Sequence, residues 1–135
     1  MKINELRDKV HANAFEKGFY EIESEINSLG VDNRAIKHAF FAQRIALIHS
    51  ELSEALEADR KNERAYGLTG VIDEKGNFDE IWFKNHIKDK IEDELADVII
   101  RVLDLCGWLN IDIEKHIELK MKYNDLRDYK HNKNY

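Results

Sequence analysis

Apolar residues recur at the spacing of an α-helix along almost the whole chain, and no proline interrupts them. This pattern constrains the fold strongly, because apolar residues that line helix faces can be buried only when helices pack together. No stretch alternates strand and helix signals. The expected helices span residues 3–28 with a break near Gly18, about Asn33–Asn62, about Ile81 or Lys84 to Cys106, and about Asp112–Tyr129. The 135 residues therefore predict a single all-α domain over 1–135, a helical bundle of about four main helices.

Glycines gather between the second and third expected helices, at Gly67, Gly70 and Gly76. The stretch from about Glu63 to Glu80 is therefore expected to be a connection that contains a short hairpin. Further along, Gly107 is expected to end the third helix from the C′ position, where glycine is favoured.

The third expected helix carries apolar residues on two adjoining faces. Ile91, Leu95, Ile99, Val102 and Cys106 lie on one face, and Ala96, Ile100 and Leu103 lie on the next. A stripe this wide favours contact with more than one neighbouring helix. We therefore expect a homo-oligomer, a dimer or a tetramer, in which a second subunit completes the bundle.

The chain is acidic, with 27 Asp and Glu against 21 Lys and Arg and a net charge of −6. This charge argues against nonspecific binding to nucleic acid or to an anionic membrane, since both need a basic surface. No apolar run is long enough to span a membrane, and the N-terminal MKINELRDKV lacks the apolar segment of a secretory signal. We expect a cytoplasmic protein whose single cysteine, Cys106, is buried and unreactive.

Carboxylates recur at i, i+3 spacing on two of the expected helices. The segment HSELSEALEADRKN places Glu51 and Glu54 beside the apolar stripe of the second helix, whereas Glu57 faces the opposite side and is expected to be solvated. The segment KIEDELADVII places Glu94 and Asp97 on one flank of the third helix in the same way. If these helices pack together, four carboxylates converge between them.

Convergence of four carboxylates is electrostatically unfavourable. Two carboxylates about 5 Å apart repel by roughly 3 kcal/mol at an effective dielectric constant near 20, so either a cation offsets the charge or some groups stay protonated. Mg²⁺, with Mn²⁺ as a substitute, prefers carboxylate oxygens and is often shared with substrate phosphates. A di-iron centre fits poorly, because no Glu is followed by His at i+3. Ordinary salt bridges from Arg44 or Arg101 remain the alternative.

The C-terminal segment is basic, since Lys and Arg outnumber Asp and Glu after Lys115. Lys120, Asn124 and Arg127 follow at i, i+4 and i+7 and so share one helix face. Lys and Arg suit phosphate, and Asn can bond to phosphate or sugar oxygens. Lys130 and His131 extend the cluster. A solvated basic tail is the alternative.

Three segments together resemble a known family. IHSELSEALEADRK, IEDELADVIIRVLDLCGWLNIDIE and LKMKYNDLRDYKH are similar to the MazG-like nucleotide pyrophosphohydrolases of the all-α NTP pyrophosphatase superfamily. NAFEKGFYE, residues 13–21, resembles the family's N-terminal helix. The resemblance covers most of the chain apart from the connection at about 63–86. One departure is that His131 is followed by Asn-Lys-Asn, where the family often has Gly-Lys-Lys.

The resemblance implies a hydrolase, a nucleotide pyrophosphohydrolase of nucleotide metabolism. Such an enzyme cleaves a ribo- or deoxynucleoside triphosphate to the monophosphate and pyrophosphate, with Mg²⁺ as cofactor and a role in cleansing the nucleotide pool. By this carry-over the metal ligands are Glu51, Glu54, Glu94 and Asp97, and the phosphate-binding residues are Lys120, Asn124, Arg127, Lys130 and His131. Glu51 or Glu54 is the expected catalytic base. The competing hypothesis is a non-catalytic helical module that binds metal or nucleotide.

Overall fold

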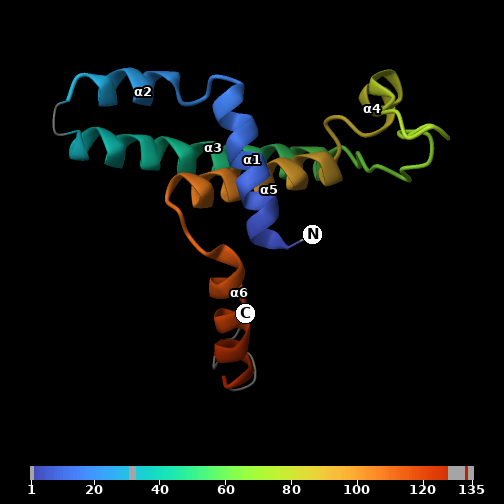
Figure 1. Ribbon diagram of the computed structural model, residues 1–135. Coiled ribbons are helices and arrows are strands. Elements are labelled where there is room, and N and C mark those ends of the chain that lie inside the picture. The colour runs from blue at the N-terminus through green and yellow to red at the C-terminus, as the bar shows by residue number, and fades with distance from the viewer. Residues whose placement is uncertain (1, 31–32, 128–132, 134–135) are drawn as a thin grey trace. The chain divides into compact units, whose positions relative to one another are not determined.

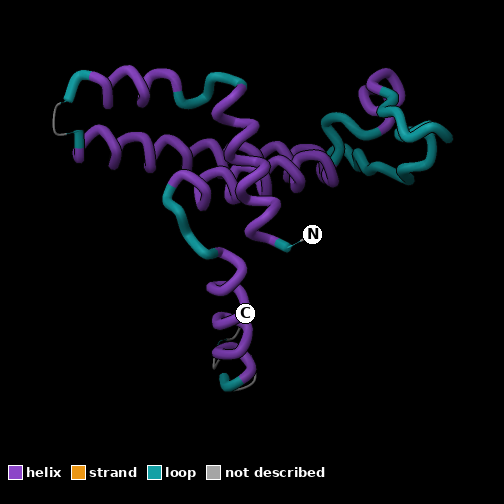
Figure 2. The backbone as a smooth tube through the Cα atoms, viewed as in Figure 1, coloured by secondary structure: helices purple, strands orange, loops and turns teal. Residues whose placement is uncertain are grey.

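The computed structural model describes residues 2–30, 33–127 and 133. In these residues the regular elements are six helices and no strand. Figures 1 and 2 trace the chain through these helices and the loops between them. The helices are α1 (Ile3–Glu16), α2 (Glu21–Ser28), α3 (Arg34–Arg60), α4 (Glu80–His86), α5 (Ile91–Trp108) and α6 (Ile113–Asp125). The predicted all-α class is confirmed. In the described residues, none of these helices combines the length and the hydrophobicity that crossing a membrane would require.

The chain forms two compact units. The first consists of Met1–Ile22 and Leu103–Tyr135, and the second of Glu23–Val102. Helix α5 begins in the second unit and ends in the first. Within the described residues, no large side chain is fully buried.

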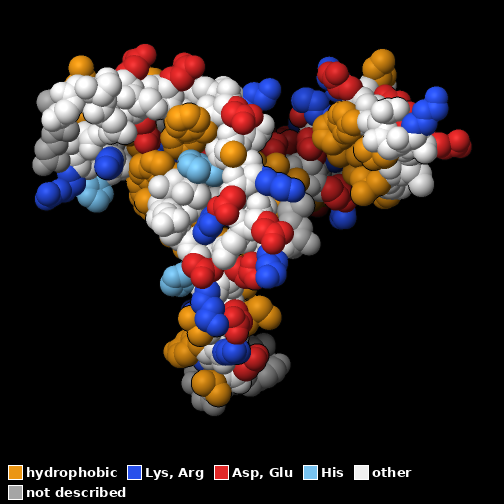
Figure 3. Space-filling model, in the orientation of Figure 1, with side chains coloured by type: hydrophobic (Ala, Val, Ile, Leu, Met, Phe, Trp, Pro, Cys, Tyr) orange, Lys and Arg blue, Asp and Glu red, His pale blue; other side chains and the backbone are white. Residues whose placement is uncertain are grey.

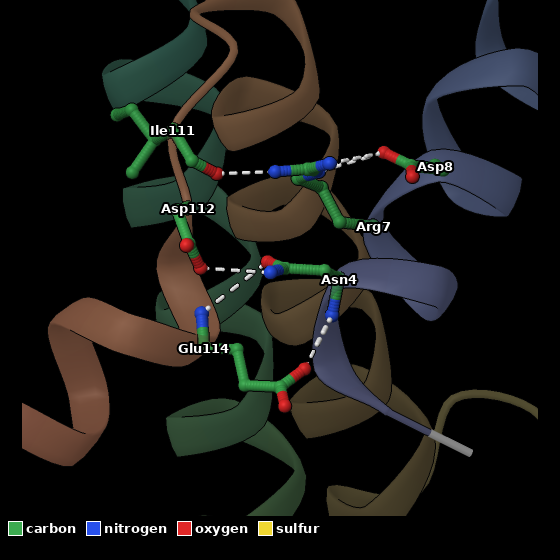
Figure 4. Close-up of polar contacts among 6 residues, drawn as sticks. All are labelled: Asn4, Arg7, Asp8, Ile111, Asp112 and Glu114. Carbon is green, nitrogen blue, oxygen red and sulfur yellow. Dashed lines mark hydrogen bonds and ion pairs between the residues drawn. The ribbon is translucent and has the colours of Figure 1, made fainter.

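The first unit joins α1 to the segment that follows α5. Asn4 contacts both sides of the α6 N-terminus: its amide donates to Asp112 at 2.7 Å, and its backbone N–H donates to the Glu114 carboxylate at 3.3 Å (Figure 4). Arg7 donates to the backbone oxygen of Ile111 at 2.6 Å. Asp112 caps α6 and accepts a hydrogen bond from the Lys115 backbone N–H at 3.0 Å.

A second set of contacts in this unit joins α1 to the end of α5. His11 Nδ1 lies 2.8 Å from Asp104 Oδ1, and the buried Tyr20 donates its hydroxyl to the same oxygen at 2.8 Å. The side chain of His11 packs directly on Gly107, because a Cβ built on that glycine would lie 2.5 Å from the His11 Cβ. The glycine allows this close approach.

The second unit is organised around α3 and α5. Arg101 of α5 bonds to Glu51 of α3. The backbone N–H of Ile91, at the start of α5, bonds to the backbone oxygen of Glu63, just after the end of α3, at 3.1 Å. The two helices therefore run antiparallel and side by side. The connection is attached to the first turn of α5 by Glu92, which accepts from Arg64 at 2.7 Å and from the Ala65 backbone N–H at 2.8 Å.

The connection itself contains the expected hairpin-like turn. Ile72 and Phe78 form an isolated antiparallel bridge. The Asp73 side chain closes the turn by accepting from the backbone N–H groups of Lys75 and Asn77, each at 2.8 Å. A further hydrogen bond, from the Asn77 side chain, is the largest cause that lowers the pKa of Asp73, and the backbone bonds lower it further.

Two helix boundaries differ from the predictions, and one predicted break is confirmed. The third expected helix is two helices, α4 and α5, because Asp89 adopts a left-handed φ of 63° between them. Helix α6 ends at Asp125 rather than near Tyr129. The predicted break of the first helix is confirmed, since Gly18 has φ 86° between α1 and α2.

The prediction that Gly107 ends the third helix is wrong. Gly107 lies inside α5, and Asn110 takes the left-handed position with φ 51°. The Ile111 backbone N–H bonds to the Cys106 oxygen at 2.8 Å, and the Asn110 N–H bonds to the Gly107 oxygen at 3.0 Å. This is a Schellman motif, in which Asn replaces the commoner Gly.

Large apolar side chains remain exposed on the helices of the second unit. On α3, Leu52 and Leu56 are 45% and 55% exposed, and on α5, Leu95 and Ile99 are 44% and 57% exposed. Figure 3 also shows hydrophobic side chains gathered on the surface formed by α4 and the preceding connection. The apolar stripes read from the sequence are therefore only partly covered within the chain.

Candidate metal centre

Three of the four predicted metal ligands meet between α3 and α5. Glu51 on α3 and Glu94 and Asp97 on α5 each place a carboxylate oxygen within 4.8 Å of the others. We call these three residues the carboxylate cluster. Antiparallel packing brings them together, because α5 presents both of its i, i+3 acids to α3 and α3 presents Glu51 to α5.

The cluster is withdrawn from solvent. Glu94 is 5% exposed and Glu51 is 8% exposed, which makes them the buried charged residues of the described chain. Burial is the main cause that raises the pKa of Glu94 from 4.5 to about 7, and the charges of Glu54, Asp93, Glu51 and Asp97 add to it. The pKa of Asp97 is also raised, again chiefly by burial.

Glu54, the fourth predicted ligand, lies at the margin of the cluster. Its side chain is exposed, and it is not among the three residues whose oxygens converge. Its charge nevertheless contributes more to the raised pKa of Glu94 than any other neighbouring charge. Glu57 is exposed and pairs loosely with Arg60 and Lys61, at 3.7 and 3.6 Å, as its expected solvated position requires.

Among the described residues, Arg101 forms a direct ion pair with the cluster. Arg101 Nε donates to Glu51 Oε1 at 2.5 Å, and its side chain is 38% exposed. The charge of Arg101 also lowers the pKa of Asp97 against the stronger effect of burial. Arg44, the other arginine considered for this role, pairs with Glu23 at 2.6 Å. The salt-bridge alternative therefore applies to Glu51.

Glu94 fits the ligand role by its lack of a partner. Within the described residues its carboxylate accepts no hydrogen bond and forms no ion pair. Burial and the neighbouring acids disfavour the charged form of this carboxylate unless it is protonated or meets a cation. Carboxylate oxygens are the ligands that Mg²⁺ and Mn²⁺ prefer. The residues that would hold such an ion are Glu51, Glu94 and Asp97.

A second group of acids adjoins the cluster through Glu94. Asp89 and Asp93 place oxygens within 4.8 Å of each other and of Glu94. Both already have partners: Asp93 accepts from the Asp89 backbone N–H at 3.0 Å, and Asp89 accepts from Lys88 at 2.6 Å. These bonds stabilise the turn between α4 and α5.

The predicted phosphate-binding residues belong to the first unit. Lys120 and Asn124 lie on α6, and Arg127 follows its end. Lys120 Nζ and Arg127 Cζ both lie over the Tyr123 ring, 5.0 and 5.8 Å from its centroid. The side-chain oxygen of Asn124 is buried without a hydrogen-bond partner. Lys130 and His131 lie outside the described residues.

Sequence reasoning underestimated one residue of the site. The sequence predicts at most a surface salt bridge from Arg101, whereas its partner Glu51 is buried. Its position four residues after Asp97 was the available signal, because i, i+4 spacing places both side chains on one face of α5.

Comparisons with protein-family models, with curated proteins and with solved structures each found no match to this chain.

Proposed function

We propose that this protein is a divalent-metal-dependent nucleoside triphosphate pyrophosphohydrolase. It would cleave a nucleoside triphosphate to the monophosphate and pyrophosphate, as the resemblance to the MazG-like enzymes implies. The observation that carries the proposal is Glu94, a buried carboxylate without a partner beside Glu51 and Asp97. Such an arrangement costs folding free energy, and a bound Mg²⁺ shared with a polyphosphate would offset that cost.

The metal ion, the catalytic base and the phosphate-binding side chains would each have a separate role in the reaction. Bound Mg²⁺ would neutralise charge on the polyphosphate and acidify a water molecule. Of the two candidate bases, Glu54 fits better, because it is exposed while Glu51 is engaged with Arg101. Glu54 would accept the water proton as the hydroxyl oxygen bonds to phosphorus and pyrophosphate departs. Lys120 and Arg127 would bind the departing pyrophosphate.

We further propose that the protein works as a homo-oligomer, a dimer or a tetramer. The exposed faces of α3 and α5 support this proposal, since Leu52, Leu56, Leu95 and Ile99 remain solvated on one chain. Large exposed apolar patches on a folded chain mark interaction surfaces. A second copy would cover these side chains.

The test of the activity is a pair of isosteric variants with a matched control. Glu94→Gln and Asp97→Asn each remove one charge from the cluster, and we expect both to lower pyrophosphate release at least a hundredfold. Glu57→Gln removes the same charge from an exposed position and should retain activity. The measurement is pyrophosphate release from a panel of ribo- and deoxynucleoside triphosphates, with Mg²⁺ and with chelator. Equal turnover in Glu94→Gln and wild type would refute the proposal.

A non-catalytic helical module is the second candidate, because Arg101 already neutralises part of the cluster without metal. Thermal unfolding separates the two. A module that binds only metal should be stabilised by Mg²⁺ and indifferent to a non-hydrolysable nucleotide, whereas a pyrophosphohydrolase should gain further stability from the nucleotide by linkage.

A further inference from the structure

Arg101 occupies the position from which a cation would neutralise the carboxylate cluster. Its Nε lies 2.5 Å from Glu51 Oε1, and Glu51 is 8% exposed. Arg101 lies one turn after Asp97 and two turns after Glu94, so all three residues share a face of α5. The guanidinium is therefore the internal counter-ion of this cluster.

A divalent ion and Arg101 would compete for Glu51. An oxygen that accepts a short charged hydrogen bond from a guanidinium offers less electron density to a metal ion, and the two positive charges repel each other. Asp97 is affected as well, because the Arg101 charge acts on its carboxylate. Binding of the metal ion therefore favours departure of the guanidinium from the cluster.

The Arg101 side chain, once released from Glu51, can extend into solvent. Arg101 is 38% exposed while its partner is buried, so its head group can swing outward without crossing the core. Arginine presents a planar fork of donors that matches phosphate oxygens in a bidentate way. A polyphosphate that shares the metal ion would place such oxygens beside the cluster.

We propose that Arg101 couples metal binding to substrate binding. Without metal it holds Glu51 and keeps the cluster from binding ions tightly; when a divalent ion binds, it leaves Glu51 and binds a phosphate group of the polyphosphate. This inference rests on the proposed metal-dependent function, and it assigns to Arg101 a role beyond the ligands of that function.

The first test measures Mg²⁺ binding by titration calorimetry in the absence of any nucleotide. In Arg101→Gln the competing charge is gone, and we expect Mg²⁺ to bind about tenfold more tightly than to wild type, since one charged hydrogen bond no longer has to be broken. Arg64→Gln is the matched control, because Arg64 forms a similar 2.7 Å pair with Glu92 outside the cluster. It should bind Mg²⁺ as wild type does.

The second test measures binding of inorganic triphosphate at saturating Mg²⁺. Here Arg101→Gln should bind about tenfold more weakly than wild type, because the arginine now acts as a ligand for phosphate. Arg101→Lys keeps the charge, so it should bind Mg²⁺ within about twofold of wild type and recover part of the triphosphate affinity. This variant also tests the inference if Arg101→Gln does not fold.

Tighter Mg²⁺ binding together with weaker triphosphate binding by Arg101→Gln would support the proposal. Unchanged or weaker Mg²⁺ binding by Arg101→Gln would overturn it, and so would unchanged triphosphate binding. If wild type binds Mg²⁺ and releases pyrophosphate while Arg101→Gln behaves identically, the inference alone fails. If wild type binds no divalent ion, the proposed function fails and the inference fails with it.

Discussion

At the scale of single residues, burial and neighbouring acids both disfavour the charged form of Glu94. It is buried, it has no partner in the described residues, and four neighbouring carboxylates act on it. Arg101 relieves Glu51 but does not bond to Glu94. A fold whose sole requirement was stability would gain by replacing Glu94 with an apolar residue. A cation bound there, as we propose, would offset this unfavourable charge.

The raised pKa of Glu94 makes a prediction about pH and stability. The folded protein holds a proton on this carboxyl up to about pH 7, whereas the unfolded chain releases it near the ordinary value of 4.5. Between these values the folded state binds more protons, so without divalent ions the free energy of unfolding should fall as pH rises from about 4.5 to 7. Asp97, whose pKa is also raised, contributes with the same sign.

Chemical unfolding in chelator at several pH values measures this slope. Glu94→Gln removes the titrating group and should reduce the slope, while Glu57→Gln, which changes an exposed acid, should leave it unaltered. Added Mg²⁺ should raise stability most at high pH, where the carboxylates are ionised. A wild-type stability that increases steadily from pH 4.5 to 7 in chelator would contradict the assigned burial of Glu94.

At the scale of elements, the helices could be predicted from the sequence and several of their ends could not. The periodicity of α3 and α5 was sufficient to place Glu51, Glu94 and Asp97 on facing flanks, because helical geometry fixes which side chains share a face. The boundaries at Asp89 and Asn110 were missed because Asp and Asn enter the left-handed region less often than Gly does. Gly107 was misread because its role, close contact with His11, depends on a residue far away in sequence.

The contact between Gly107 and His11 predicts how α1 and α5 respond to a single added methyl group. Gly107→Ala should gain up to about 1 kcal/mol of helix propensity. It should lose more to overlap, since the new Cβ would lie 2.5 and 2.7 Å from the Cβ and Cγ of His11, and overpacking costs about 1–3 kcal/mol. We expect net destabilisation of about 1–2 kcal/mol in denaturant unfolding.

A double variant separates the gain in helix propensity from the cost of the overlap. In a His11→Gly background both the Cβ and the ring of His11 are gone and the overlap is relieved, so Gly107→Ala should become less destabilising or stabilising relative to His11→Gly alone. Equal effects in both backgrounds would show that His11 does not lie against Gly107.

At the scale of the whole molecule, a single chain leaves its apolar helix faces unfinished. In the described residues no large side chain is fully buried, although a chain of this size normally encloses a complete core. Leu56 on α3 and Ile99 on α5 are each more than half exposed. Association with a second copy would bury such faces and enlarge the buried apolar surface.

The oligomer is tested by placing a charge on these faces. Leu56→Glu and Ile99→Glu should each shift the protein toward a smaller species in light scattering coupled to size-exclusion chromatography, because a buried unpaired carboxylate opposes association by several kcal/mol. Leu68→Glu is the control: Leu68 is 66% exposed, but it lies on the connection rather than on α3 or α5, and this variant should keep the wild-type mass.

A wild-type protein that is monomeric at micromolar concentration would refute the proposed oligomer. A wild-type oligomer that both helix variants leave intact would place the interface elsewhere. Loss of mass in both helix variants and not in the control would assign the exposed faces of α3 and α5 to the subunit interface.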